Sequence, residues 1–201
     1  MVNSKNKGNT FERKTAEILG NWWKAKFNRS PQSGGASWAS ENNAVGDIIT
    51  SAEARFPLVV ECKDRENWTL DNVLLNNKEP HTWWQQVVGD AEAVDKSPCL
   101  IFKRKYSQIY VALPYVEDVY MKLRENTEPI MRTDFIINNT VKDELYYDVL
   151  ITTIESLTSL KPSYIRSHYD NLDWSAYRIE KSEVNKATQD TSSIDDMLSN
   201  I

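Results

Sequence analysis

The fold of this chain is decided by two short stretches of sequence, VGDIIT at residues 45–50 and LVVECK at residues 58–63. Both are short apolar runs rich in β-branched residues, and together they predict two neighbouring strands. The second run is apolar enough to be buried, yet it ends with two charged residues, Glu61 and Lys63. Because side chains alternate between the faces of a strand, Glu61 and Lys63 project together while Cys62 points into the core.

The charged residues of these two strands suit a metal site. If the strands pair as a hairpin, the carboxylates of Asp47 and Glu61 meet at one edge of the sheet. Two converging carboxylates suit Mg²⁺, which prefers oxygen ligands and retains several waters, and the backbone carbonyl of Cys62 could add a third oxygen. Such an ion supports phosphodiester hydrolysis. Lys63 could orient or deprotonate the attacking water, or neutralise charge that develops on the phosphate.

The same residues have a plainer interpretation. Asp47 could be an ordinary turn residue, and Glu61 with Lys63 could be a solvent-exposed pair at the end of a strand. An acidic residue followed two positions later by lysine is common, so this spacing does not by itself identify a nuclease.

The remaining elements extend outward from these strands. An Asn9–Glu12 capping box predicts the start of an amphipathic helix over residues 10–26. The spacing of apolar residues after this helix predicts strands at 27–30, 99–103 and 109–113. The same spacing predicts helices at 82–95, from Pro114 to Arg124, and at 143–160. This order predicts an α/β fold with one central mixed sheet flanked by helices.

Three regions are expected along the chain. Residues 1–113 form the core, with 64–80 as an insertion; residues 114–181 form an extension packed on that core. Residues 182–201 form an acidic tail whose composition predicts disorder. A weak apolar stripe in this tail could bind a protein partner, although a solubilising tail without a partner is the plainer interpretation.

Composition limits the class of protein. The chain has 201 residues, is 40% hydrophobic and carries a formal net charge of −5. It contains no apolar run long enough for a membrane span and no apolar signal-peptide core, so we expect a cytoplasmic protein, in the host cell if the source is viral. The net charge argues against a nucleic-acid partner. Residues 1–38, however, hold seven basic and two acidic side chains, which could contact phosphates or be an ordinary solvated face.

Several motifs resemble the PD-(D/E)xK nuclease superfamily, and within it the archaeal-type Holliday junction resolvases and their phage relatives. The resemblance covers about residues 5–113 and depends on the order of the motifs. These are Lys7-Gly8 with Glu12-Arg13, Arg29-Ser30 with Ser33-Gly34-Gly35, Gly46-Asp47-Ile48-Ile49, Val60-Glu61-Cys62-Lys63, and Trp83 with Gln86 ahead of residues 98–103. The proline that names the superfamily is replaced by Gly46.

The resemblance implies a role for each matching residue. Asp47 and Glu61 would bind Mg²⁺, for which Mn²⁺ could substitute, and Lys63 would be the catalytic lysine. Glu12 would be a further acidic residue near the metal, and Ser33 would lie near the scissile phosphate. The next helix would supply Gln86, with Gln85 as a rival.

The resemblance also implies a substrate and an assembly. The expected function is a Mg²⁺-dependent DNA endonuclease that resolves four-way junctions as a homodimer, since two symmetric nicks need two sites related by a two-fold axis. The expected DNA contacts are Lys5, Lys7, Arg13, Arg29, Ser33, Gly34 and Gly35. The alternatives are another nuclease of the superfamily (restriction-type, repair nickase or exonuclease) and a non-catalytic DNA-binding protein with this fold.

Overall fold

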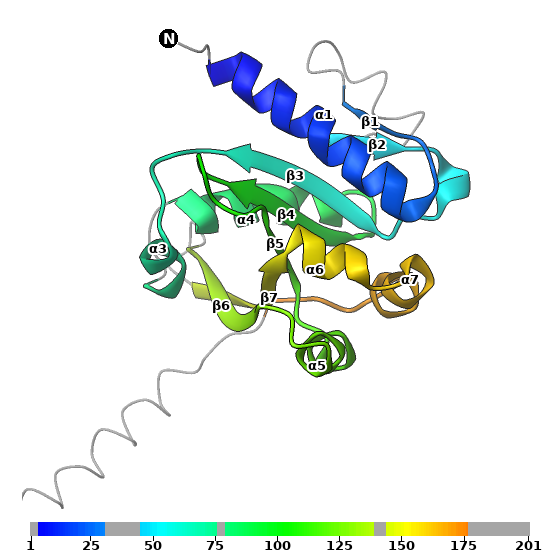
Figure 1. The fold of residues 1–201 in the computed structure, drawn as a ribbon. Coiled ribbons are helices and arrows are strands. Elements are labelled where there is room, and N and C mark those ends of the chain that lie inside the picture. The colour runs from blue at the N-terminus through cyan, green and yellow to red at the C-terminus, as the bar shows by residue number, and fades with distance from the viewer. Residues whose placement is uncertain (1–3, 31–44, 76–78, 139–143, 177–201) are drawn as a thin grey trace, which may run out of the picture.

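The computed structural model describes residues 4–30, 45–75, 79–138 and 144–176 (Figure 1). The Ser33-Gly34-Gly35 loop and the tail of residues 182–201 lie outside the described residues, so the predictions made for them stay predictions. Within the described residues, no helix combines the length and apolar character needed to cross a membrane.

One seven-stranded sheet runs through the molecule in the order β1-β2-β3-β4-β5-β7-β6. Neighbouring strands are antiparallel except for β3 and β4, which are parallel. The strands are β1 (Phe27–Arg29), β2 (Ile48–Thr50), β3 (Leu58–Asp64), β4 (Ser97–Lys103), β5 (Tyr110–Pro114), β6 (Ile130–Asn138) and β7 (Glu144–Thr153). The predicted α/β fold with a central mixed sheet is confirmed.

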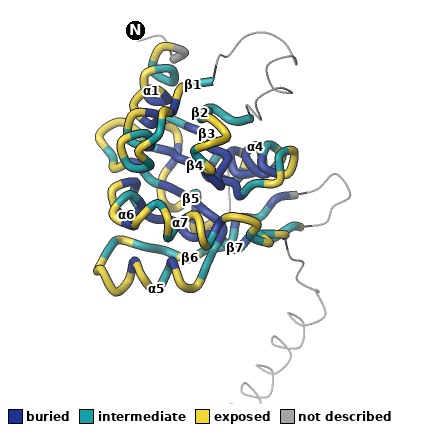
Figure 2. Tube along the Cα trace, turned by 90° about the vertical axis from the view of Figure 1, so that its right-hand side faces the viewer, coloured by how far each residue is buried: buried dark blue, intermediate teal, exposed yellow. Residues whose placement is uncertain are grey.

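Helices cover both faces of this sheet (Figures 1 and 2). The first face carries α1 (Ser4–Trp23), α5 (Glu117–Glu125), α6 (Ile154–Ser159) and α7 (Pro162–Tyr169), and the second carries α3 (Leu70–Leu74) and α4 (Glu79–Glu92). A short 3-10 helix, η1 (Ala52–Ala54), lies between β2 and β3. Strand β3 shows how the two cores divide. Val60 and Cys62 pack in the first core, whereas Val59 packs in the second, as the alternation of a strand requires.

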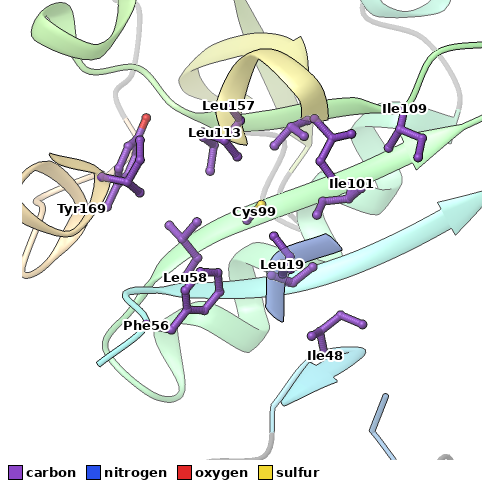
Figure 3. Packing of buried hydrophobic residues seen from close by; sticks show 14 of the residues in the cluster. Leu19, Ile48, Phe56, Leu58, Cys99, Ile101, Ile109, Leu113, Leu157 and Tyr169 are labelled. Carbon is purple, nitrogen blue, oxygen red and sulfur yellow. The ribbon is translucent and has the colours of Figure 1, made fainter. Parts of the chain in front are cut away.

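The first core joins the two halves of the chain (Figure 3). Leu19 of α1 packs in the same cluster as Leu157 and Tyr169, which come from the C-terminal helices. Polar contacts reinforce this packing. The Trp22 indole N–H donates to the Leu160 carbonyl at 2.8 Å, and the Tyr169 hydroxyl donates to the Pro114 carbonyl at 3.0 Å. The residues after Leu113 therefore share a core with the residues before it.

The second core fixes helix α4 against the sheet. Trp84 and Val87 of α4 are fully buried, and the Trp84 ring packs edge-on against Phe135 with centroids 5.5 Å apart. The segment between β3 and α4 also contributes, because Trp68 and Val73 are buried in the same cluster. This packing fixes the position of Gln86, which lies in the middle of α4 and contacts Lys63 of β3.

Two sequence predictions are wrong in a way that has a physical cause. Helix α1 begins by Ser4, so Asn9 lies inside it and does not form a capping box with Glu12. Residues 144–153 form strand β7, and only 154–159 of the predicted helix at 143–160 are helical. Strand β7 lies between β5 and β6, and this buried central place suits its β-branched residues better than a helix does.

A chain shortened to residues 1–116 should fail to fold. The truncation removes β7, leaves the pairing edge of β5 open, and exposes Val111 and Leu113, which are now fully buried. We expect no cooperative thermal transition and no near-ultraviolet circular dichroism from packed aromatic rings. A chain that lacks only residues 182–201 is the control and should unfold cooperatively. A cooperative transition in the 1–116 chain would contradict the shared core.

Candidate active site

The backbone of Asp47 is held by both neighbouring strands. Its N–H donates to the Val60 carbonyl at 2.8 Å, and its carbonyl accepts from the Ser30 N–H at 2.7 Å. Its carboxylate accepts the backbone N–H of Cys62 at 2.8 Å. The side chain of Asp47 is therefore fixed against the end of β3, as the predicted hairpin requires.

Gly46 explains why the superfamily's proline is absent. Its φ is +83°, a value that proline cannot adopt and that side chains generally disfavour. A Cβ atom at this position would lie 2.7 Å from the Val60 carbonyl oxygen. The glycine thus lets the chain pass close to β3 immediately before Asp47.

Glu61, Lys63 and Gln86 form one connected group. Glu61 is 3% exposed and forms an ion pair with the Lys63 ammonium. The same ammonium donates to the side-chain carbonyl of Gln86 on α4 at 2.9 Å. Gln86, and not its rival Gln85, is the residue that contacts Lys63. The structure therefore brings together residues from three segments: Asp47 directly before β2, Glu61 and Lys63 on β3, and Gln86 on α4.

The carboxylate of Asp47, which is half-buried, lies beside that of Glu61, which is buried. Burial, together with repulsion from Asp47, raises the pKa of Glu61 to about 7, although Lys63 opposes the shift. Burial likewise raises the pKa of Asp47, while the Cys62 N–H opposes the shift. The carboxyl groups of Asp47 and Glu61 are close enough to share a hydrogen bond when one of them is protonated. The site thus concentrates negative charge that Lys63 only partly offsets.

This donor set fits a hard divalent cation. Two neighbouring carboxylates, one buried and one half-buried, supply the oxygen ligands and the negative charge that such an ion needs. In the described part of the chain, no three His, Cys, Asp or Glu residues are grouped so that they could hold a metal. The site is therefore an open pair of carboxylates. It suits Mg²⁺, which is usually bound by one or two carboxylates and keeps several waters.

Other predicted site residues lie elsewhere. Glu12 is buried on α1 and forms an ion pair with Arg29 of β1, on the face of the sheet opposite to Lys63. The structure therefore does not bring Glu12 together with Asp47 and Glu61, and it places Arg29 in a pair with a carboxylate. Lys7 pairs with Asp64 and Glu66. Arg13 is exposed on α1, and the side chain of Lys5 lies outside the described part.

Asp90 is a residue near the site that the sequence reasoning missed. It follows Gln86 by four positions on α4, so the two side chains lie on the same side of the helix. Burial raises the pKa of Asp90, and the charge of Lys63 opposes this shift. The i, i+4 spacing on the predicted helix could have placed Asp90 next to Gln86.

Comparison with known proteins identifies a family. A family model described as "Phage putative PDDEXK endonuclease" matches residues 3–167, which is most of the chain. Comparison with curated proteins and with solved structures gives no significant match.

Replacing Gly46 with alanine should destabilise the fold and disturb Asp47. The new Cβ would meet the Val60 carbonyl oxygen at 2.7 Å, in a backbone conformation that alanine disfavours. We expect a loss of about 1–4 kcal/mol in the free energy of unfolding, measured by urea denaturation. Gly89→Ala is the matched control, because a Cβ there meets nothing within 4 Å and α4 favours alanine. Equal stability of the two variants would contradict the close approach.

Glu61→Gln should stabilise the metal-free protein at pH 8. The folded-state pKa of Glu61, about 7, lies above its unfolded value of roughly 4.3, so the native state binds the proton more tightly. The stability of the wild type therefore falls as pH rises between these values and stays reduced above them. Glutamine removes this penalty, on the order of 1–3 kcal/mol at pH 8, and the gain should shrink toward pH 5. The measurement is thermal melting in chelator at pH 8 and at pH 5. A stability difference between variant and wild type that does not change with pH would refute the raised pKa of Glu61.

Proposed function

The chain belongs to the family of phage PDDEXK endonucleases, and on this premise we propose that it is a Mg²⁺-dependent DNA endonuclease with its active site at Asp47, Glu61 and Lys63. The observation that carries the proposal is the half-buried carboxylate of Asp47 beside the buried carboxylate of Glu61, which is paired with Lys63 at the end of β3. Burying charge in this way costs stability unless a ligand compensates it. A divalent cation is the ligand that this donor set fits.

Asp47 and Glu61 would hold the ion. When bound, such an ion polarises a phosphoryl oxygen and lowers the pKa of a coordinated water. The Cys62 N–H fixes the orientation of the Asp47 carboxylate, and the Lys63 ammonium fixes that of Glu61. The backbone carbonyl of Cys62 is proposed as a third oxygen ligand.

Lys63 would act on the phosphate or on the attacking water. An ammonium has three N–H donors, and Glu61 and Gln86 accept two of them. The third is available to a phosphate oxygen or a water beside the carboxylates. Gln86 is thus a positioning residue that holds the ammonium at the carboxylate pair, and it allows Lys63 to stabilise developing negative charge without rearrangement.

The proposed substrate is branched DNA, in particular a four-way junction, cleaved by a homodimer. The support is the order of motifs shared with junction resolvases, which runs from Lys7-Gly8 to Val60-Glu61-Cys62-Lys63. The second candidate is another nuclease activity of the same superfamily. It is favoured by residues 114–176, which add β6, β7 and three helices to the fold. An intact Asp47, Glu61 and Lys63 trio argues against a non-catalytic DNA-binding protein.

Loss of the carboxylate pair or of the lysine should remove cleavage. We expect Asp47→Asn and Lys63→Ala each to lower the rate on labelled DNA by at least about 100-fold, equivalent to ~2.7 kcal/mol in the barrier. Chelator should abolish the wild-type activity, and Mg²⁺ or Mn²⁺ should restore it. Glu155→Gln, which alters an exposed carboxylate on α6, is the matched control and should cleave normally. Rates within tenfold of wild type for either site variant would refute the proposal.

The substrate preference needs its own assay. We expect paired, symmetric nicks in a synthetic four-way junction, and slower cleavage of a linear duplex, a flap and single-stranded DNA of the same sequence. Sedimentation of the active species should give the mass of two chains. Equal rates on all four DNAs, or activity from a monomer, would favour the second candidate.

A further inference from the structure

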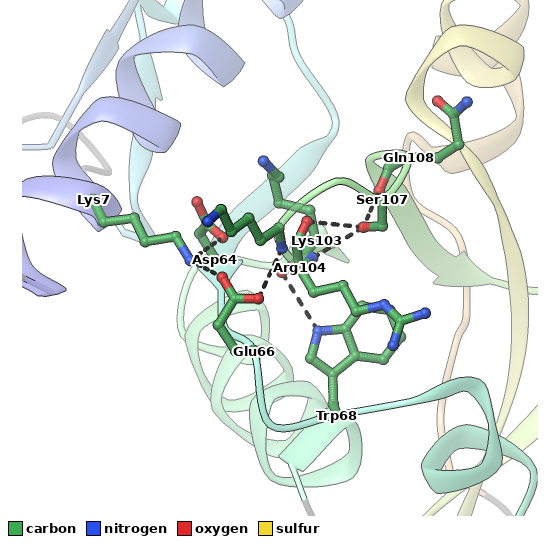
Figure 4. Close-up of polar contacts among 9 residues, drawn as sticks. Lys7, Asp64, Glu66, Trp68, Lys103, Arg104, Ser107 and Gln108 are labelled. Carbon is green, nitrogen blue, oxygen red and sulfur yellow. Dashed lines mark hydrogen bonds and ion pairs between the residues drawn. The ribbon is translucent and has the colours of Figure 1, made fainter. Parts of the chain in front are cut away.

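The turn between β4 and β5 is short, basic and well ordered by its own hydrogen bonds. Lys103 is the last residue of β4, and Arg104, Lys105 and Tyr106 follow it in the turn. The Arg104 N–H donates to the hydroxyl of Ser107 at 3.0 Å, and the Ser107 N–H donates to the Arg104 carbonyl at 3.2 Å (Figure 4). Arg104 and Lys105 therefore lie on a defined turn.

The acidic side chains beside this turn already have partners. Lys7 reaches from α1 to Asp64, at 3.2 Å, and to Glu66 (Figure 4). Glu66 also accepts the backbone N–H of Lys105 at 3.0 Å. These contacts explain why Lys7, a predicted DNA contact, is engaged within the protein. The pKa of Glu66 is lowered mainly by its hydrogen bond from Lys7, and the charge of Lys105 makes a smaller contribution.

Three basic side chains are exposed together at this end of the sheet. Arg104 and Lys105 project from the turn, and Arg65 follows β3. The two segments are joined because the Arg65 N–H donates to the Lys103 carbonyl at 3.0 Å. We call these three residues together with Tyr106 the basic patch.

The ring of Tyr106 is accessible for contact with another molecule. Its side chain is 93% exposed, and its φ of +61° is unusual for a bulky residue. The Lys105 ammonium lies 4.7 Å from the centre of its ring. An aromatic ring held in solvent beside a cation offers a stacking surface for a nucleic-acid base.

The basic patch lies beside the active site. In the parallel pairing of β3 with β4, Lys63 is opposite Phe102, and Arg104 follows Phe102 by two residues. At roughly 3.3 Å per residue and about 4.8 Å between strands, the turn lies on the order of 10 Å from Lys63 along the backbone. That separation corresponds to about three nucleotides of a DNA strand.

We propose that the basic patch holds the substrate strand on one side of the scissile phosphate, with Arg65, Arg104 and Lys105 on the backbone and Tyr106 stacked on a base face exposed at a branch point. The proposal rests on the proposed function in taking DNA as the substrate. The net charge of −5 favours a localised contact of this kind, because the chain as a whole carries the same sign of charge as DNA.

Binding measurements test the patch separately from cleavage. Every protein carries Asp47→Asn to prevent turnover, and the probes are a fluorescein-labelled four-way junction and a duplex of the same sequence. Arg104→Ala with Lys105→Ala should weaken binding of both probes by tenfold or more at about 0.1 M salt, and should lower the slope of log K against log salt by about 1.8. Lys122→Ala with Arg124→Ala removes the same charge from α5, at the opposite end of β5, and should leave both quantities unchanged.

Tyr106 is tested by the difference between the two probes. Tyr106→Ala should weaken binding to the junction by roughly fivefold to 100-fold and binding to the duplex much less, with the salt slope retained. Tyr106→Phe keeps the ring and should bind as the parent does. A 2-aminopurine placed at the branch point should be quenched by the parent protein and by Tyr106→Phe, and not by Tyr106→Ala. Thermal melts identify any variant that fails to fold, and Tyr106→Leu then replaces Tyr106→Ala.

The outcomes separate the two proposals. An unchanged affinity and salt slope in the Arg104 and Lys105 variant would overturn the basic patch even if the wild type cleaves DNA. Equal losses on both probes with Tyr106→Ala would overturn the stacking role. If the wild type cleaves no DNA while binding still depends on the patch and not on Lys122 and Arg124, the patch stands and the proposed nuclease activity fails.

Discussion

Two carboxylates held side by side with little access to water, Glu61 buried and Asp47 half-buried, repel each other, and the packing around β3 keeps them together. Asp47 cannot turn away, because its backbone is bonded to Val60 and its carboxylate to the Cys62 N–H. Glu61 is only 3% exposed, because β3 is a central strand with helices on both faces. The repulsion is offset in part by Lys63, and a bound cation would offset the remainder. The carboxylate pair therefore lowers the stability of the metal-free fold, as functional sites often do.

The rest of the chain supplies the rigidity that this arrangement needs. Helix α4 presents Gln86 to Lys63 only because Trp84 and Val87 fix it against the sheet. On the other face, α1 and the C-terminal helices bury Val60 and Cys62, which hold β3 in place. The seven-stranded mixed sheet flanked by helices is consistent with a restriction-endonuclease-like fold, as membership of the PDDEXK family implies.

The sequence predicted the central strands and the residues that meet there. A buried strand is expected to stay apolar to its end, whereas this one ends with Glu61 and Lys63. Such departures from the local pattern often mark functional sites. Strand β7 was predicted incorrectly because an apolar run of ten residues fits either helix or strand until its neighbours are known. The pairing of Lys7 with Glu66 joins residues 59 apart in sequence, and local reasoning has no access to such contacts. Asp90 was missed because its relation to Lys63 depends on how α4 packs against β3.

The central claim is that Asp47 and Glu61 form one metal site at the end of β3. Crystals of the Glu12→Gln protein and of the wild type, both grown with Mn²⁺, would test it through the anomalous scattering of the metal. The account predicts a peak between the carboxylates of Asp47 and Glu61 in both crystals, since Glu12 lies on the other face of the sheet in a pair with Arg29. A peak located elsewhere, or one that disappears with Glu12→Gln, would contradict it.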